Sequence, residues 1–218
     1  MPYQAIARWS PPHDLGGIMA RSIWLWLGLA ISGALMPTVA SAHTGIGDTG
    51  GFAHGFLHPV TGLDHILAMV TVGIFAWQLG GRAIWLVPAS FVAIMALGGM
   101  LGIAAIGVPL VELAIAVSVI VLGAMVAAGV KAPLAVAMGI VGLFAMFHGH
   151  AHGAVMPETA AGVAYGLGFM LATAMLHLAG VGIGFLIGRS GDQYGQVGVR
   201  AAGGVVAIAG IGILAGAI

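Results

Sequence analysis

The stretch His58-Pro-Val-Thr-Gly-Leu-Asp64-His65 places two imidazoles and a carboxylate where an apolar segment, residues 61–79, begins. Ionisable side chains are costly inside a bilayer, so within a membrane segment they indicate a functional site. Alternatively, Thr61 or Asp64 could cap a helix by accepting hydrogen bonds from its exposed N–H groups. The two histidines beside the aspartate, and a second histidine cluster further along, favour a site for a divalent metal ion.

The composition is that of an integral membrane protein. Of the 218 residues, 61% are hydrophobic and only 6% are charged, and the mean hydropathy is +1.13. So few charges cannot cover the surface of a water-soluble domain. Thirty-eight glycines favour closely packed helices, and no alternating strand pattern supports a β-barrel. The lack of cysteine excludes disulfides and thiolate metal sites, and a formal net charge of zero gives nucleic-acid binding no electrostatic support.

The first part of the chain has the layout of a secretory signal peptide. A positive charge, a short apolar run and an A-x-A-like cleavage site follow one another: Arg21, residues 23–36 and Ala40-Ser41-Ala42. We expect residues 1–42 to be removed, leaving residues 43–218 as the transmembrane domain. The alternative, an uncleaved extra span, is disfavoured because the run is short for crossing a bilayer. The first 18 residues do not fit a signal peptide, so Met19 is the better candidate for the true start.

Six apolar segments follow and predict an all-α bundle of six transmembrane helices. They cover approximately residues 61–79, 84–106, 110–130, 133–152, 159–187 and 199–218. Because the connections are short, consecutive helices should be antiparallel neighbours. Glycines spaced four apart, such as Gly98 and Gly102, should allow helix backbones to approach closely.

Basic residues indicate how the chain is oriented. Those of the mature part fall in the connections after the first, third and fifth segments: Arg82, Lys131, Arg189 and Arg200. The positive-inside rule makes these connections cytoplasmic, and the signal peptide independently places the mature N-terminus outside. We therefore expect a multi-pass protein of the bacterial inner membrane with both mature termini in the periplasm.

Ligand-type side chains from separate segments should meet near the outer face. Counting about 20 residues from Pro133 places the second histidine cluster at the outer end of its helix, level with the start of the first segment. In a helix, His148 and His152 share a face, whereas His150 points elsewhere. The candidate metal ligands are His58, Asp64, His65, Glu112, His148, His150 and His152. Imidazole and carboxylate without thiolate suit nickel, cobalt, zinc or copper(II). The alternative is a solvated histidine tract with adventitious metal affinity.

Three more polar residues are candidates for a transport path: His54, Glu158 and His177. His54 would share a helical face with His58, but Pro59 predicts that His58 is not helical, so a ligand role and a surface role are equally favoured for His54. Glu158 is most simply a first-turn residue favoured by the helix dipole. His177 lies near the midplane, where it is either a relay ligand or proton acceptor or, slightly favoured, a neutral histidine with one interhelical hydrogen bond.

Two motifs resemble those of the HupE/UreJ family. One is Phe56-Leu-His-Pro-Val-Thr-Gly-Leu-Asp-His-Ile-Leu-Ala-Met69, and the other is Phe147-His-Gly-His-Ala-His-Gly153. The resemblance covers the whole mature chain and includes the signal peptide. It implies a small nickel permease associated with hydrogenase or urease maturation. It carries the family's functional positions onto His58, Asp64, His65, Glu112, His148 and His152. One position departs, since Val155 stands where the family pattern has a glutamate. Either Glu158 substitutes for it one turn later, or the site lacks a carboxylate, which bears on metal choice or affinity.

The expected function is therefore uptake of Ni²⁺, with Co²⁺ or Zn²⁺ as other candidate ions, by a protein that is not an enzyme and holds no permanent cofactor. Its expected partners are the metal ion, membrane lipid and cytoplasmic nickel metallochaperones, with no nucleic acid. No nucleotide-binding loop is present, so an ion gradient, the membrane potential or cytoplasmic trapping must drive transport. Two alternatives stay open: an intramembrane zinc hydrolase and a periplasm-facing metal sensor or storage protein.

Overall fold

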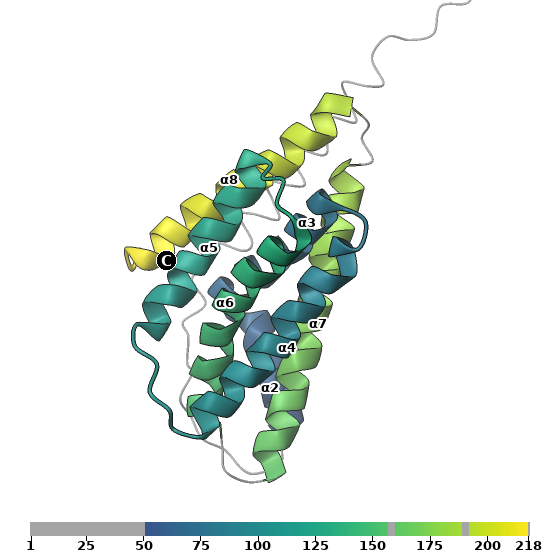
Figure 1. Cartoon of the computed structure of the whole chain (residues 1–218). Helices are drawn as coiled ribbons and strands as arrows, with labels where there is room; N and C mark the ends of the chain where they lie inside the picture. Colours follow the sequence, from purple (N-terminus) through teal and green to yellow (C-terminus); the bar gives the residue numbers. More distant parts are fainter. Residues whose placement is uncertain (1–50, 157–159, 189–191, 218) are drawn as a thin grey trace, which may run out of the picture. The chain divides into compact units, whose positions relative to one another are not determined.

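The computed structural model describes residues 51–156, 160–188 and 192–217, and in these parts the chain forms helices and no strand. The helices are α2 (Gly51–Thr61), α3 (Leu63–Leu79), α4 (Ala83–Ile103), α5 (Val111–Ala128), α6 (Leu134–Ala154), α7 (Ala160–Gly188) and α8 (Asp192–Leu214) (Figure 1). The expected signal peptide, together with Glu158 and Arg189, lies outside the described residues.

The prediction of a multi-pass, all-α membrane protein is confirmed. Five helices, α4 to α8, are long and apolar enough to cross a bilayer. The pair α2 and α3 meets the same test only when taken together, and the two helices meet at an angle of 78°. Such a pair is either one broken span or a re-entrant loop, so the count of six spans stays a prediction.

The break between α2 and α3 corrects one expectation from the sequence. His58 is helical, and α2 continues through the buried Pro59 to Thr61. The carbonyl groups of this last turn have other donors: the Thr61 hydroxyl donates to Leu57 O and His58 O at 3.0 and 3.1 Å, and Gly62 N–H also donates to His58 O. The proline therefore sits in a terminal turn whose carbonyls are satisfied locally, and the chain bends directly after it.

Close backbone contacts hold the helices in pairs. Helix α4 packs along α6, α5 along α8, and α7 along both α2 and α3. The most extensive packing is therefore between helices that are not consecutive along the chain, and the expectation that consecutive helices would be the main neighbours was wrong. At the α4–α6 contact, a Cβ added to Gly98 or Gly102 would lie 2.2 or 2.4 Å from a backbone atom of α6. The spacing of these two glycines correctly predicted a close helix approach. This contact fixes the end of α6 that carries the histidines.

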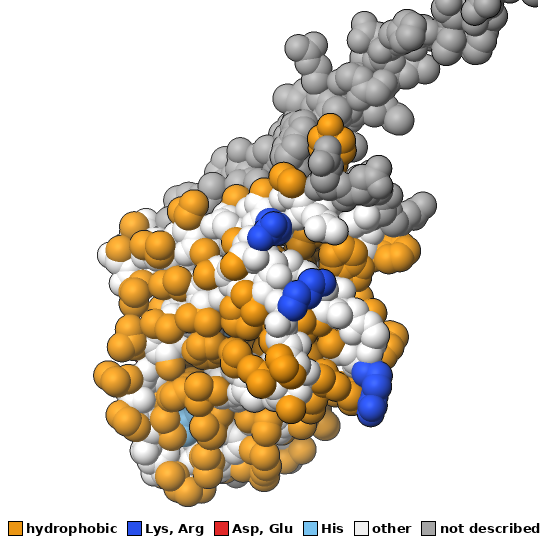
Figure 2. All heavy atoms as spheres, turned by 45° about the horizontal axis from the view of Figure 1, so that its top comes forward, with side chains coloured by type: hydrophobic (Ala, Val, Ile, Leu, Met, Phe, Trp, Pro, Cys, Tyr) orange, Lys and Arg blue, Asp and Glu red, His pale blue; other side chains and the backbone are white. Residues whose placement is uncertain are grey.

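The basic side chains of the described chain gather at one end of the bundle. Figure 2 shows lysine and arginine side chains together on a face that is otherwise largely hydrophobic. Arg82 lines a pocket with Ala132 and Leu134, and Arg200 bonds to the last turn of α5, so the α3–α4 and α5–α6 connections and the start of α8 lie close together. The predicted alternation of basic connections is therefore present, while the assignment of this end to the cytoplasm stays a prediction.

Arg200 stabilises the end of α5. Its guanidinium donates to Ala127 O at 3.0 Å and to Ala128 O at 2.7 Å, two carbonyls that a helix end leaves without intrahelical partners. We expect Arg200→Met to lower the free energy of unfolding by about 1 kcal/mol, measured by thermal unfolding in detergent. Lys131→Met is the control, because Lys131 is exposed and makes no hydrogen bond among the described residues. Equal melting temperatures for the two variants would contradict this role.

Candidate metal centre

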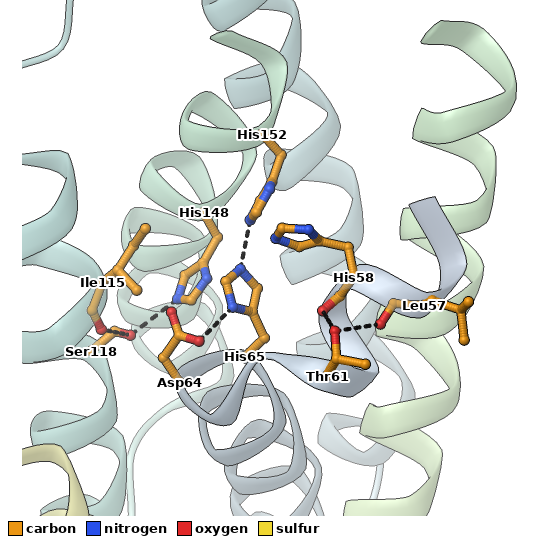
Figure 3. Close-up of polar contacts among 9 residues, drawn as sticks. All are labelled: Leu57, His58, Thr61, Asp64, His65, Ile115, Ser118, His148 and His152. Carbon is orange, nitrogen blue, oxygen red and sulfur yellow. Dashed lines mark hydrogen bonds and ion pairs between the residues drawn. The ribbon is translucent and has the colours of Figure 1, made fainter. Parts of the chain in front are cut away.

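Three imidazoles converge from three helices. They belong to His58 in the last turn of α2, His65 in the first turn of α3 and His152 near the end of α6 (Figure 3). One ring nitrogen from each lies within 4.8 Å of the others, and His65 Nε2 lies 2.5 Å from His152 Nε2. His65 and His152 are buried and His58 is half-buried. We refer to these three residues as the histidine cluster.

The bend at Gly62 brings the rings of His58 and His65 close together, in a perpendicular arrangement. The six residues between them span the break, so the end of α2 and the start of α3 both contribute a ring to the same space. A Cβ at Gly62 would lie 2.9 Å from His65 Nδ1 and 3.0 Å from Asp64 Oδ1. Any larger residue here would crowd the imidazole–carboxylate pair. Glycine is therefore needed here for room, since its backbone conformation is one that any residue can adopt.

Asp64 orients the ring of His65. The two side chains are 2.7 Å apart between Nδ1 and Oδ1, and since an ionised carboxylate can only accept, the proton lies on Nδ1. His65 Nε2 therefore directs a lone pair into the cluster, in the carboxylate–histidine arrangement found around metal ions in proteins. The N-cap residue of α3 is Gly62, and the Thr61 hydroxyl donates to carbonyls of α2, so Thr61 does not cap α3. The Asp64 carboxylate also interacts with the backbone N–H of His65, so it has a local role at the helix start besides orienting the ring.

The hydrogen bond between His65 and His152 lies where a metal ion would bind, and the ion would take the place of the proton that the two rings share. Because His65 Nε2 accepts, the proton shared with His152 belongs to His152 Nε2. His152 Nδ1 is buried and has no hydrogen-bond partner among the described residues, so it can carry the ring's proton when an ion takes the place of the hydrogen bond to His65. Two nitrogens around a tetrahedral ion lie about 3.3 Å apart, so the rings must separate slightly. A cavity of about 310 Å³ between α4, α6 and α7, with His152 in its wall, offers space for that movement.

His148 lies beside the cluster with a free lone pair. Its ring centre is 5.3 Å from that of His65, and its side chain is completely buried. The Ser118 hydroxyl donates to Ile115 O at 2.6 Å and therefore accepts from His148 Nε2–H at 3.1 Å. The lone pair of His148 is thus on Nδ1, which has no partner among the described residues. His148 is a fourth imidazole available to an ion.

The other predicted site residues lie apart from the cluster. His150 Nε2 donates to Ile106 O at 2.7 Å, so this ring turns toward the α4–α5 connection, as its spacing predicted. Glu112 is exposed in the first turn of α5, and His54 is exposed with its ring 5.7 Å from that of Tyr165. His177 is buried deeper in α7.

The family model described as HupE / UreJ protein matches residues 29–213. This chain belongs to the HupE/UreJ family. It is 50% identical over 181 residues to "Protein HupE" of Rhizobium leguminosarum bv. viciae, an alignment that covers 83% of this chain and 93% of that protein. No solved structure matches the chain. Members of the HupE/UreJ family are accessory proteins and not enzymes, so the hydrolase alternative is set aside.

Two aromatic side chains that line the site in this HupE/UreJ protein, Phe169 and Tyr165, were not predicted from the sequence. The centre of the Phe169 ring lies 4.3 Å from that of His152. It lies 6.1 Å from the ring centre of His65 and 6.2 Å from that of His58. Tyr165, one turn earlier on α7, stands 6.4 Å from His58. Their spacing of four residues is visible in the sequence, but apolar helices contain many such pairs, so the pattern alone did not identify them.

Asp64→Asn tests the orienting role of the carboxylate in this HupE/UreJ protein. An asparagine amide can donate to His65 Nδ1, which would turn a proton of the imidazole toward the cluster. We expect nickel affinity to fall about 10- to 100-fold, measured by equilibrium dialysis of the purified protein. Glu112→Gln, which changes an exposed carboxyl outside the cluster, should have much less effect. A comparable loss in Glu112→Gln would show that Glu112 acts at the site.

Proposed function

We propose that this HupE/UreJ protein is a permease that takes up Ni²⁺ from the periplasm to supply hydrogenase or urease maturation. The observation that carries the proposal is the convergence of His58, His65 and His152 from three helices, with ligand atoms within 4.8 Å of one another. Such a group of imidazoles within a membrane bundle is costly unless it serves a function. Family membership supports an accessory role of this kind.

The donor set favours a borderline divalent ion. Neutral imidazoles supply lone pairs in place of water, and the Asp64 carboxylate, bonded to His65, offsets part of the ion's charge. Nickel, cobalt and zinc all accept such ligands, whereas calcium and magnesium prefer oxygen. Among these ions, we propose Ni²⁺ as the transported one because of the family to which the chain belongs.

The position of the cluster fits uptake from outside. His65 begins α3 and the basic end of the bundle follows Leu79, about 21 Å away by helix rise. If the basic end faces the cytoplasm of a bacterial inner membrane, the cluster opens toward the periplasm, and both mature termini are periplasmic. Residues 1–42 would then act as the signal peptide that starts this insertion.

The membrane potential is a sufficient driving force. A divalent ion moving inward through 100 mV gains about 4.6 kcal/mol, which corresponds to an accumulation of roughly three orders of magnitude. Cytoplasmic nickel metallochaperones would hold the delivered ion and keep its free concentration low. No nucleotide hydrolysis is needed in this scheme.

Uptake of radioactive nickel into proteoliposomes tests the proposal. We expect saturable uptake by the purified protein that increases with an inside-negative potential and is reduced by competing cobalt or zinc but not by magnesium. Protein-free liposomes give the background. Tight nickel binding without flux would overturn the permease function and favour a sensor or storage protein instead.

A further inference from the structure

His177 is a buried imidazole that lacks partners. Its side chain is fully buried in α7, and neither ring nitrogen has a hydrogen-bond partner among the described residues. The single interhelical hydrogen bond that the sequence slightly favoured is therefore not seen in this part of the chain. A neutral imidazole always carries one N–H, and burying that group unpaired costs about 1–3 kcal/mol. A residue kept at such a cost calls for a functional reason.

Counting residues along α7 and along α3 gives the same distance between His177 and the histidine cluster. Along α7, His177 follows Phe169 by eight residues, or about 12 Å of helix rise, on the same helical face. Along α3, Gly73 follows His65 by eight residues, and a Cβ at Gly73 would lie 2.1 Å from His177 O. His177 therefore lies roughly 12 Å from the cluster in the direction of the basic end.

Phe91 connects His177 to the site described above. Its ring, fully buried in α4, lies 4.9 Å from the ring of His177 and 5.8 Å from that of His148. His148 in turn lies 5.3 Å from His65. Ring contacts therefore run without a break from the cluster into the bundle, in the order His65, His148, Phe91 and His177.

Building on the proposed permease function, we propose that His177 is a second, inner ligand for the transported divalent ion. The ion passes from the cluster and His148 to His177, and the Phe91 ring separates the two positions. A single imidazole with water as co-ligand binds such an ion weakly, which suits release toward the cytoplasmic side. Nickel, cobalt and zinc all bind imidazole, so the inner ligand matches the outer ones in chemical class.

Two substitutions at His177 test the proposal, with nickel uptake by proteoliposomes and nickel binding in detergent as separate measurements. We expect His177→Leu to reduce uptake at least about tenfold while binding at the outer cluster persists. His177→Cys should restore part of the uptake and shift the preference from nickel toward cadmium, because a thiolate is a softer ligand. The chain has no native cysteine, so this thiol is unique. A purely structural role would leave ion preference unchanged.

Thr71→Val is the matched control. Thr71 is also buried, and its hydroxyl oxygen lacks a partner among the described residues, but it lies two residues from Gly73 and so on a different face of α3 from the contact with His177. We expect wild-type uptake from this variant.

Three results would overturn the inner ligand: wild-type uptake by His177→Leu, a loss of uptake in Thr71→Val as large as that in His177→Leu, or an unchanged ion preference in His177→Cys. The last measurement decides the question even if His177→Leu fails to accumulate. Absence of nickel uptake by the wild-type protein would instead contradict the permease function itself.

Discussion

Replacing His65 by alanine is expected to abolish specific nickel binding, with a loss in affinity of at least about 100-fold. His65 is the central member of the cluster: its Nε2 faces His152, its ring centre lies 5.6 Å from that of His58, and its Nδ1 bonds to Asp64. The substitution removes one ligand and also leaves the carboxylate without its donor. Isothermal titration or equilibrium dialysis of the purified protein measures the effect.

His54→Ala is the matched control for His65→Ala. His54 is on the same chain segment, but it is exposed and its ring faces Tyr165, outside the cluster. We expect this variant to bind nickel with near wild-type affinity. If His65→Ala bound nickel as tightly as His54→Ala, with both variants folded by circular dichroism, the cluster would not be the metal site.

The sequence predicted the helices of this membrane bundle well because hydrocarbon imposes a simple rule. A span needs about 20 apolar residues and cannot leave backbone groups unpaired. The expected segment 84–106 corresponds to α4 (Ala83–Ile103), and the expected segment 110–130 to α5 (Val111–Ala128). The ends of the helices are marked in the sequence by glycine, proline and charged residues, and these signals do not depend on how the helices pack.

The sequence predicted which end of each helix carries the candidate site residues, but it predicted their direction around each helix less well. Counting residues along a span gives the level of a side chain in the membrane, and it placed Glu112 at the level of the histidines. Its orientation depends on which helices pack beside α5, and the structure leaves Glu112 exposed. For His148 and His152 the spacing of four residues predicted a shared helical face, and both rings do lie close to His65, although His148 bonds to Ser118 and His152 contacts His58.

The sequence also did not predict the local role of Asp64 or the bend after α2. An aspartate followed by a histidine can act as a cap, a ligand or an orienting partner, and only the 2.7 Å contact with His65 Nδ1 distinguishes the last of these. Pro59 usually ends a helix before itself. Here α2 continues through Pro59 to Thr61, and the Thr61 hydroxyl and Gly62 N–H donate to carbonyls of the last turn, contacts that the sequence did not predict.

The largest effect on stability is expected from Gly149→Ala. A Cβ at this position would lie 1.9 Å from Met95 O and 2.9 Å from Gly99 N, which are backbone atoms of α4 and cannot rotate away. The helices must separate to accommodate it, at a cost of at least about 3 kcal/mol in the free energy of unfolding. Gly149 lies between His148 and His150 on α6, so the same separation would displace His152 from the cluster.

Gly139→Ala shows what the same substitution does without a facing helix. It lies on α6 as well, but a Cβ there meets no atom within 4 Å. Since alanine favours helix by about 1 kcal/mol over glycine, this variant should melt at or above the wild-type temperature. Thermal unfolding in detergent and the amount of protein in the membrane measure both variants. Equal stability of the two would mean that α4 and α6 do not touch at Gly149, and the placement of His152 beside His65 would lose its structural basis.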